Sequence, residues 1–191
     1  MKRSEINAIY HEATRVFTDH GWVLPPEPLW DMTDFGLGDF ANYGLVLVNL
    51  AEEVEYCEKL MYARPGQRTP AHTHKQKKED IICRQGVLEL QLWEGLPTEC
   101  SEDASFPVQV NGRLRDHRNG AVIVLQAGER ITLTPGIYHE FWAGAPETII
   151  GEVSTANDDA NDNFFFNPDV GRFPGIEEDE AAAVHLISEA V

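Results

Sequence analysis

Three histidines and a glutamate have the types and the spacing of a metal site. His72 and His74 are one strand repeat apart, so on an extended strand both imidazoles point to the same side. Glu79 follows His74 by five positions and joins them only if the chain turns or bulges in between. We expect these three side chains to converge from one hairpin, with His139 of segment 136–139 as the fourth ligand. Imidazoles and a carboxylate in such a set bind a divalent cation.

The spacing around these ligands resembles the two signature motifs of the cupin superfamily. The first, G-x5-H-x-H-x4-E-x6-G, is matched in full by Gly66, His72, His74, Glu79 and Gly86. The second, G-x5-P-x-G-x2-H-x3-N, is matched in part by Gly128, Gly136 and His139, with the proline one position late at Pro135 and Ala143 in place of the asparagine. The resemblance implies a cupin-type antiparallel β-barrel, or jelly roll, and all four expected metal ligands are in place.

The rest of the chain predicts the elements that hold these residues. Apolar residues at a 3.6-residue period predict a helix with Ser4 as N-cap and Gly21 just past its end. Beyond Trp30, short apolar runs separated by turn residues predict an antiparallel sandwich or barrel. We therefore expect an all-β fold with an N-terminal helix and short peripheral helices. A single domain is expected, made of helix and connector (1–40), barrel core (41–166) and C-terminal cap (167–191).

Some local patterns make more specific predictions. Four apolar runs predict two hairpins: 81–83 with 87–93 about Gly86, and 108–110 with 114–116 about Asn111-Gly112. The acidic run 177–180 predicts a solvated surface, and the apolar stretch 181–187 predicts a short helix or strand.

Composition excludes several classes of partner. The net charge of −17 argues against nucleic acid and against an anionic membrane. Three cysteines without CxxC spacing fit free thiols in a reducing compartment. The N-terminus lacks the apolar core of a signal peptide, and no apolar run is long enough to span a bilayer. We expect a cytoplasmic protein.

Two further residues have the chemistry to move protons beside a metal. If the strand is regular up to Glu79, Lys77 shares its face and reaches the cavity, where desolvation would lower the lysine pKa. A solvated lysine on a turn fits the spacing equally well. Glu152 lies in the apolar segment 149–154, where an inward carboxylate would serve as general base. A Glu152 that points outward or bonds a neighbouring strand also fits that spacing equally well.

Within the cupins the chain resembles the D-lyxose isomerase group, aldose–ketose isomerases that use manganese. The resemblance is carried by segments 72–79, 135–141, 151–154, 157–159, 162–163 and 171–174. It implies metal binding by His72, His74, Glu79 and His139, and proton transfer by Lys77 and a downstream carboxylate, which we match to Glu152. We also assign Lys75, Asp162 and Phe141, which lie in these segments, to substrate binding.

We therefore expect a metal-dependent isomerase that converts an unphosphorylated aldose such as D-lyxose, and also D-mannose, to the ketose through a cis-enediol. The expected ion is Mn²⁺, with Fe²⁺, Co²⁺, Ni²⁺ and Zn²⁺ as alternatives, and the expected assembly is a homodimer. Two other functions remain open: an iron(II)-dependent cupin dioxygenase, because ligand type alone does not fix the metal, and a non-catalytic sugar-binding cupin.

Overall fold

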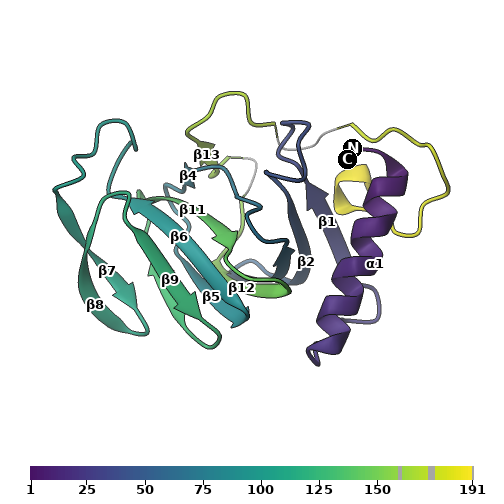
Figure 1. Cartoon of the computed structure of the whole chain (residues 1–191), viewed down its shortest axis with the longest axis horizontal. Helices are drawn as coiled ribbons and strands as arrows, with labels where there is room; N and C mark the ends of the chain where they lie inside the picture. The colour runs from purple at the N-terminus through teal and green to yellow at the C-terminus, as the bar shows by residue number, and fades with distance from the viewer. Residues whose placement is uncertain (159–160, 172–174, 191) are drawn as a thin grey trace.

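Antiparallel strands are the main regular element of residues 1–158, 161–171 and 175–190, the part of the chain that the computed structural model describes (Figure 1). The elements are α1 (Arg3–Asp19), β1 (Leu29–Thr33), β2 (Leu45–Glu52), β3 (Tyr56–Ala63), β4 (His72–Thr73), β5 (Glu79–Gln85), β6 (Val87–Trp93), β7 (Ser105–Val110), β8 (Arg113–Arg118), β9 (Val122–Gln126), β10 (Arg130–Leu133), β11 (Tyr138–Ala143), β12 (Thr148–Thr155), β13 (Phe164–Phe165) and the 3₁₀ helix η1 (Ile187–Ala190). Among the described residues, no helix has the length and apolar character needed to cross a bilayer.

The strands form two sheets that share one hydrophobic core. The larger has eight strands in the order β1-β2-β3-β12-β5-β10-β7-β8, and the smaller has five in the order β13-β4-β11-β6-β9. One buried cluster joins them, with Ile81 and Ile131 from the larger sheet and Leu88 and Leu90 from the smaller. The predicted cupin-type jelly roll is confirmed, with two separately hydrogen-bonded sheets rather than one continuous barrel.

The chain passes from the larger sheet to the smaller at Gly86, so the predicted hairpin about this residue is wrong. β5 pairs with β10 and β12, whereas β6 pairs with β9 and β11. Gly86 has a φ of 76°, and a Cβ atom there would lie 2.6 Å from Oγ1 of Thr148. Glycine alone accepts this conformation and this close approach together. β4 and β5 also belong to different sheets, so His72 and Glu79 do not come from one hairpin.

The second predicted hairpin is confirmed. Val110 of β7 pairs with Arg113 of β8, which leaves a two-residue loop. In that loop Asn111 has a φ of 51° and Gly112 a φ of 76°. Positive φ at both positions is what a type I′ turn requires, and asparagine followed by glycine is the pair that best tolerates it.

The helix α1 covers the outer face of the larger sheet at the end formed by β1, β2 and β3 (Figure 1). Its apolar side chains follow the predicted period and pack against Trp30 and the strands beside it. The helix begins at Arg3, so Ser4 is not its N-cap. Ser4 instead donates from its N–H and its hydroxyl to the carboxylate of Asp179. The C-terminus of the helix is as predicted, with Gly21 at a φ of 77° just past it.

The acidic run near the end of the chain is exposed, as predicted, and it also closes the start of α1. The guanidinium of Arg3 is buried and bonds the carboxylates of Glu178 and Glu189. Unsatisfied N–H groups at a helix N-terminus favour acidic groups at this place. The prediction of a helix or strand over 181–187 is wrong for 181–186, which has neither, and η1 begins only at Ile187.

Candidate functional site

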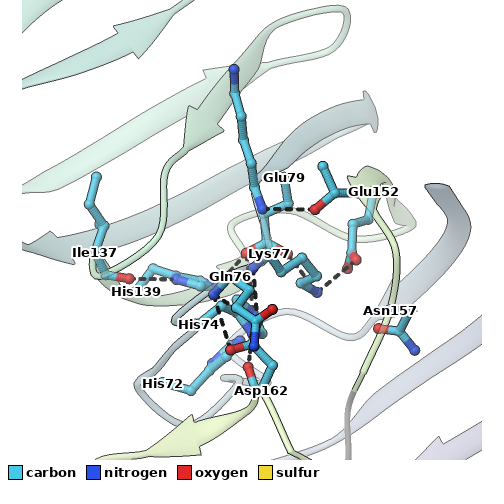
Figure 2. A network of polar contacts seen from close by, with 12 residues as sticks. His72, His74, Gln76, Lys77, Glu79, Ile137, His139, Glu152, Asn157 and Asp162 are labelled. Carbon is cyan, nitrogen blue, oxygen red and sulfur yellow. Dashed lines mark hydrogen bonds and ion pairs between the residues drawn. The ribbon is translucent and has the colours of Figure 1, made fainter. Parts of the chain in front are cut away.

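A cavity of about 100 Å³ lies between the two sheets, and its wall is built by residues that are far apart in the sequence. The six predicted metal-binding and proton-transfer residues all line it: His72, His74, Lys77, Glu79, His139 and Glu152. Figure 2 shows these side chains converging from strands of both sheets and from the turn between β4 and β5. A set of acids, bases and imidazoles is thus enclosed together, largely shielded from water.

The three imidazoles come from neighbouring strands of the smaller sheet. His72 of β4 pairs directly with His139 of β11, and His74 follows β4 immediately. One nitrogen from each ring lies within 4.8 Å of the corresponding nitrogens of the other two rings. This separation is short enough for the three nitrogens to coordinate one ion.

Backbone carbonyls fix the tautomer of each ring. The Nδ1–H of His72 donates to the carbonyl of Pro70 at 2.9 Å, that of His74 to Asp162 at 2.5 Å, and that of His139 to Ile137 at 3.2 Å. Each Nε2 therefore keeps its lone pair. The Nε2 atoms of His74 and His139 are buried without a hydrogen-bond partner, the state expected of nitrogens that coordinate a cation.

Glu79 joins the histidines from the first position of β5, in the other sheet. Its Oε1 is 3.0 Å from Nε2 of His139 and 3.6 Å from Nε2 of His74, and it accepts no hydrogen bond. Burial opposes its ionisation, but Lys77 and the histidines together hold the pKa of Glu79 well below its ordinary value. Burial also holds the pKa of His72 and of His74 below the ordinary value. Three imidazoles with open Nε2 atoms beside one carboxylate are a donor set that fits a divalent cation.

Lys77 bridges the two carboxylates of the cavity. Its Nζ is 2.8 Å from Oε2 of Glu79 and 3.0 Å from Oε1 of Glu152. Burial by itself would lower the pKa of Lys77, but the two carboxylates outweigh it and raise the pKa above its ordinary value. The expected lowering of this pKa is therefore wrong, and Lys77 is a cation. Its route into the cavity also differs, because it projects from the irregular turn before β5 rather than from a regular strand.

Glu152 points into the cavity from β12, which settles the choice that its spacing left open. Ile150, two residues earlier, belongs to the core between the sheets, whereas Ile149 packs under α1 on the other face. Glu152 is 6% exposed and bonds Lys77. A carboxylate that is buried beside a cation and open to a cavity can take a proton from a bound substrate.

Sequence reasoning missed Lys59, a buried lysine on β3. Its Nζ lies 3.7 Å from Oε1 of Glu152 and 3.2 Å from Oδ1 of Asn157. The missed signal was a lysine two residues before Met61, on the otherwise apolar inward face of the strand. Asn163 and Phe165 also line the cavity.

The three predicted substrate-binding residues have different surroundings. Phe141 of β11 is part of the cavity wall. The side chain of Lys75 is outside that wall, with its ammonium 4.0 Å from the centre of the Phe164 ring. Asp162 is also outside it, because its carboxylate accepts hydrogen bonds from backbone N–H groups of residues 75–77.

Known proteins are similar to this chain in sequence and in fold. Residues 27–190 match the family model described as D-lyxose isomerase. The chain is 37% identical to the D-lyxose/D-mannose isomerase of Escherichia coli O157:H7, over 99% of this chain and 98% of that one. It is 32% identical to the D-lyxose ketol-isomerase of Cohnella laeviribosi, over 94% and 100%.

A solved structure of L-ribose isomerase from Acinetobacter sp. DL28, in complex with L-ribose, superposes with a TM-score of 0.67. The superposition covers 93% of this chain and 98% of that one at 15% identity, which shows a common fold. Family membership rests on the family match and on the relatives of higher identity, which span nearly the whole chain. This chain belongs to the D-lyxose isomerase family.

Proposed function

We propose that this protein is a metal-dependent aldose–ketose isomerase for unphosphorylated sugars, converting D-lyxose to D-xylulose and D-mannose to D-fructose. The observation that carries the proposal is the meeting of three imidazole Nε2 lone pairs with the Lys77–Glu152 pair in one buried cavity. The names of the relatives, D-lyxose/D-mannose isomerase and D-lyxose ketol-isomerase, support the choice of sugars.

His72, His74, His139 and Glu79 would hold a divalent cation. Mn²⁺ is the ion we propose, and Fe²⁺, Co²⁺, Ni²⁺ and Zn²⁺ accept the same ligand types. When bound, such a cation polarises the sugar carbonyl as a Lewis acid and makes the C2 hydrogen more acidic. Because one of the four ligands is charged, the metal site keeps a net positive charge for this purpose.

Glu152 would carry the proton between the two carbons. Its carboxylate takes the proton from C2, the C–H electron pair forms the C1–C2 double bond, and the carbonyl electrons move to O1. A proton passes from O2 to O1 by way of the cis-enediol, and Glu152 returns its proton to C1 to give the ketose. Lys77, which stays charged, donates hydrogen bonds to the oxygen on which negative charge develops.

The charges in the cavity favour a sugar without phosphate. Among the described residues of the wall, the cationic side chains are Lys59 and Lys77, and both face the carboxylate of Glu152. A phosphate group requires additional cationic donors, arginines above all. Phe141 and Phe165 supply apolar surface for the C–H groups of the ring or chain. D-lyxose and D-mannose have the same configuration at C2 and C3, so a site that binds these hydroxyls accepts both.

We also propose that the protein is a homodimer in the cytoplasm. Cys57, Cys83 and Cys100 are all free, which supports a reducing compartment. The net charge of −17 disfavours nucleic acid and anionic membranes as partners. Light scattering on the eluting peak of a gel-filtration column tests the assembly, and we expect twice the mass of one chain.

Isotope incorporation tests the reaction. Metal-free protein is reloaded with Mn²⁺ and incubated in deuterated water with D-lyxose, D-mannose and other unphosphorylated aldoses. We expect D-xylulose and D-fructose with deuterium at C1, because in a fraction of turnovers the proton on Glu152 exchanges with solvent before it is returned to the sugar. Oxygen uptake that needs Fe²⁺ would point instead to a dioxygenase, and saturable sugar binding without turnover would point to a binding protein.

A further inference from the structure

Asp162 connects two segments of the site that are far apart in sequence. Its side chain is 4% exposed, and its carboxylate accepts hydrogen bonds from three successive backbone N–H groups. The N–H of Lys75 bonds Oδ1 at 2.8 Å, that of Lys77 bonds Oδ2 at 2.8 Å, and that of Gln76 lies 3.1 Å from both oxygens. Successive N–H groups around one anion form a nest, a strong arrangement because each bond is charge-assisted (Figure 2).

The main chain of the same residue reaches a metal-ligand candidate. The carbonyl of Asp162 accepts the Nδ1–H of His74 at 2.5 Å. One residue thus orients His74 through its backbone and holds the turn 75–77 through its side chain. His74 directly follows β4 of the smaller sheet and Glu79 begins β5 of the larger sheet, so the residues between them must place both side chains in the cavity.

The turn has no regular backbone pattern of its own to give it shape. Residues 74–78 lie between β4 and β5 without helix or strand geometry. Gly136 donates to the carbonyl of His74 at 2.8 Å and Thr155 to that of Lys78 at 3.0 Å, which fixes the ends of the segment. The Asp162 carboxylate is what satisfies the three N–H groups in the middle, from which Lys77 projects inward.

We propose that Asp162 is a positioning residue of the site: its carboxylate sets the turn that directs Lys77 and Glu79 toward the three imidazoles. It acts through other residues and contacts no substrate, which replaces its earlier assignment to sugar binding. The kinetic part of this inference rests on the proposed isomerase function. The metal-binding part does not, because it concerns only the arrangement of Glu79 and His74.

The substitution Asp162→Asn tests the side chain alone, because it keeps the carbonyl that bonds His74. An amide in this place turns an NH₂ group toward backbone donors and removes the negative charge of the nest. Loss of an outer-shell partner typically weakens metal affinity or activity about 10–100-fold. We expect a fall of that size in Mn²⁺ affinity, measured by EPR of the free ion during titration of metal-free protein, and in kcat for D-lyxose at saturating Mn²⁺.

The matched control is Asp158→Asn. Asp158 is an exposed aspartate four residues before Asp162 in the sequence. Its carboxylate accepts hydrogen bonds from the backbone and side-chain nitrogens of Asn161. Its substitution should leave Mn²⁺ affinity, kcat and KM unchanged. A residue that only stabilises the fold would lower the melting temperature of the Asp162 variant and leave the Mn²⁺ affinity of its folded fraction intact, and that result would overturn the proposal.

Wild-type protein gives an independent test if the Asp162 variant does not fold. Hydrogen exchange of the amides of residues 75–77 should be as slow as that of the strands beside them, although Lys75 and Gln76 have exposed side chains. Exchange at the rate of an open loop would overturn the proposal. Neither this measurement nor Mn²⁺ titration involves a sugar, so a failed isomerase assay on wild-type protein would refute the proposed function without deciding the role of Asp162.

Discussion

The two walls of the cavity are built on different principles. The wall from the smaller sheet presents imidazoles, and each ring is anchored by a carbonyl of the main chain. The wall from the larger sheet presents the charged groups Glu79, Glu152 and Lys59, held by one another and by Lys77. Hydrogen bonds to the backbone orient the imidazoles whatever the charges around them. The side chains of the charged wall are oriented by ion pairs, so replacing any one of them disturbs the others.

This difference predicts how substitutions on each wall should act. A change on the imidazole wall removes a proposed metal ligand and leaves its neighbours in place, because their anchors are separate. A change at Glu152 or Lys59 on the charged wall leaves the four proposed metal ligands in place but redistributes charge around the reacting carbons. Metal affinity and turnover should therefore separate, and the substitutions below test that separation.

The largest effect is expected from His139→Ala. It removes one of the Nε2 atoms from the cluster, so Mn²⁺ affinity should fall by more than the roughly 100-fold that marks the upper range for outer-shell partners, and turnover should fall with it. Calorimetric Mn²⁺ titration and ketose assays measure both. The control is His117→Ala, a histidine on β8 away from the cavity wall. Wild-type Mn²⁺ affinity in the His139 variant would contradict the ligand assignment.

Glu152→Gln should separate the two walls most clearly. We expect kcat to fall by about 10²–10⁴-fold, the usual contribution of a general base, while Mn²⁺ affinity changes little. Steady-state kinetics and the same titration measure this. The control is Glu58→Gln on β3, next to Lys59 and so on the other face of that strand. If the Glu152 variant keeps full turnover, another group is the base.

A smaller and graded effect is expected from the two lysines. Lys77→Met leaves two buried carboxylates without their shared cation, and breaking a buried pair in this way costs about 3–5 kcal/mol of stability. Lys59→Met should cost less, because Lys59 is 3.7 Å from Glu152, compared with 3.0 Å for Lys77. Urea unfolding of both variants and of wild-type protein ranks them, and an equal or reversed ranking would contradict the picture of Lys77 as the bridge.

The pH dependence of the Lys77 contribution has a definite sign. Its pKa in the folded protein is raised above the ordinary value of 10.5, so its stabilisation is fully present below that value and is lost only as the pH rises through the folded pKa. The stability deficit of Lys77→Met should therefore be the same at neutral and at mildly alkaline pH.

The local sequence was enough to predict the strand-rich fold, the meeting of His72, His74 and His139, and the Asn111-Gly112 hairpin. It was not enough to predict the path of the chain at Gly86, because a glycine turn between two apolar runs looks the same whether the runs pair or enter different sheets. The decisive contact there is with Thr148, far along the chain. The backbone contacts of the Asp162 carboxylate could not be predicted either, because its partners at 75–77 are more than eighty residues away and no local pattern reveals them.

The carbonyl anchors of the imidazoles also determine how the protein should respond to loss of the proposed ion. Because each ring is already oriented by its Nδ1–H bond, an arriving cation finds its nitrogen donors preorganised and freezes few side-chain rotations. The fold should therefore not depend on the ion, in contrast to a zinc finger, which unfolds without its metal. A chelator should accordingly empty the centre while the jelly roll stays folded, and one preparation can be reloaded with different ions in turn.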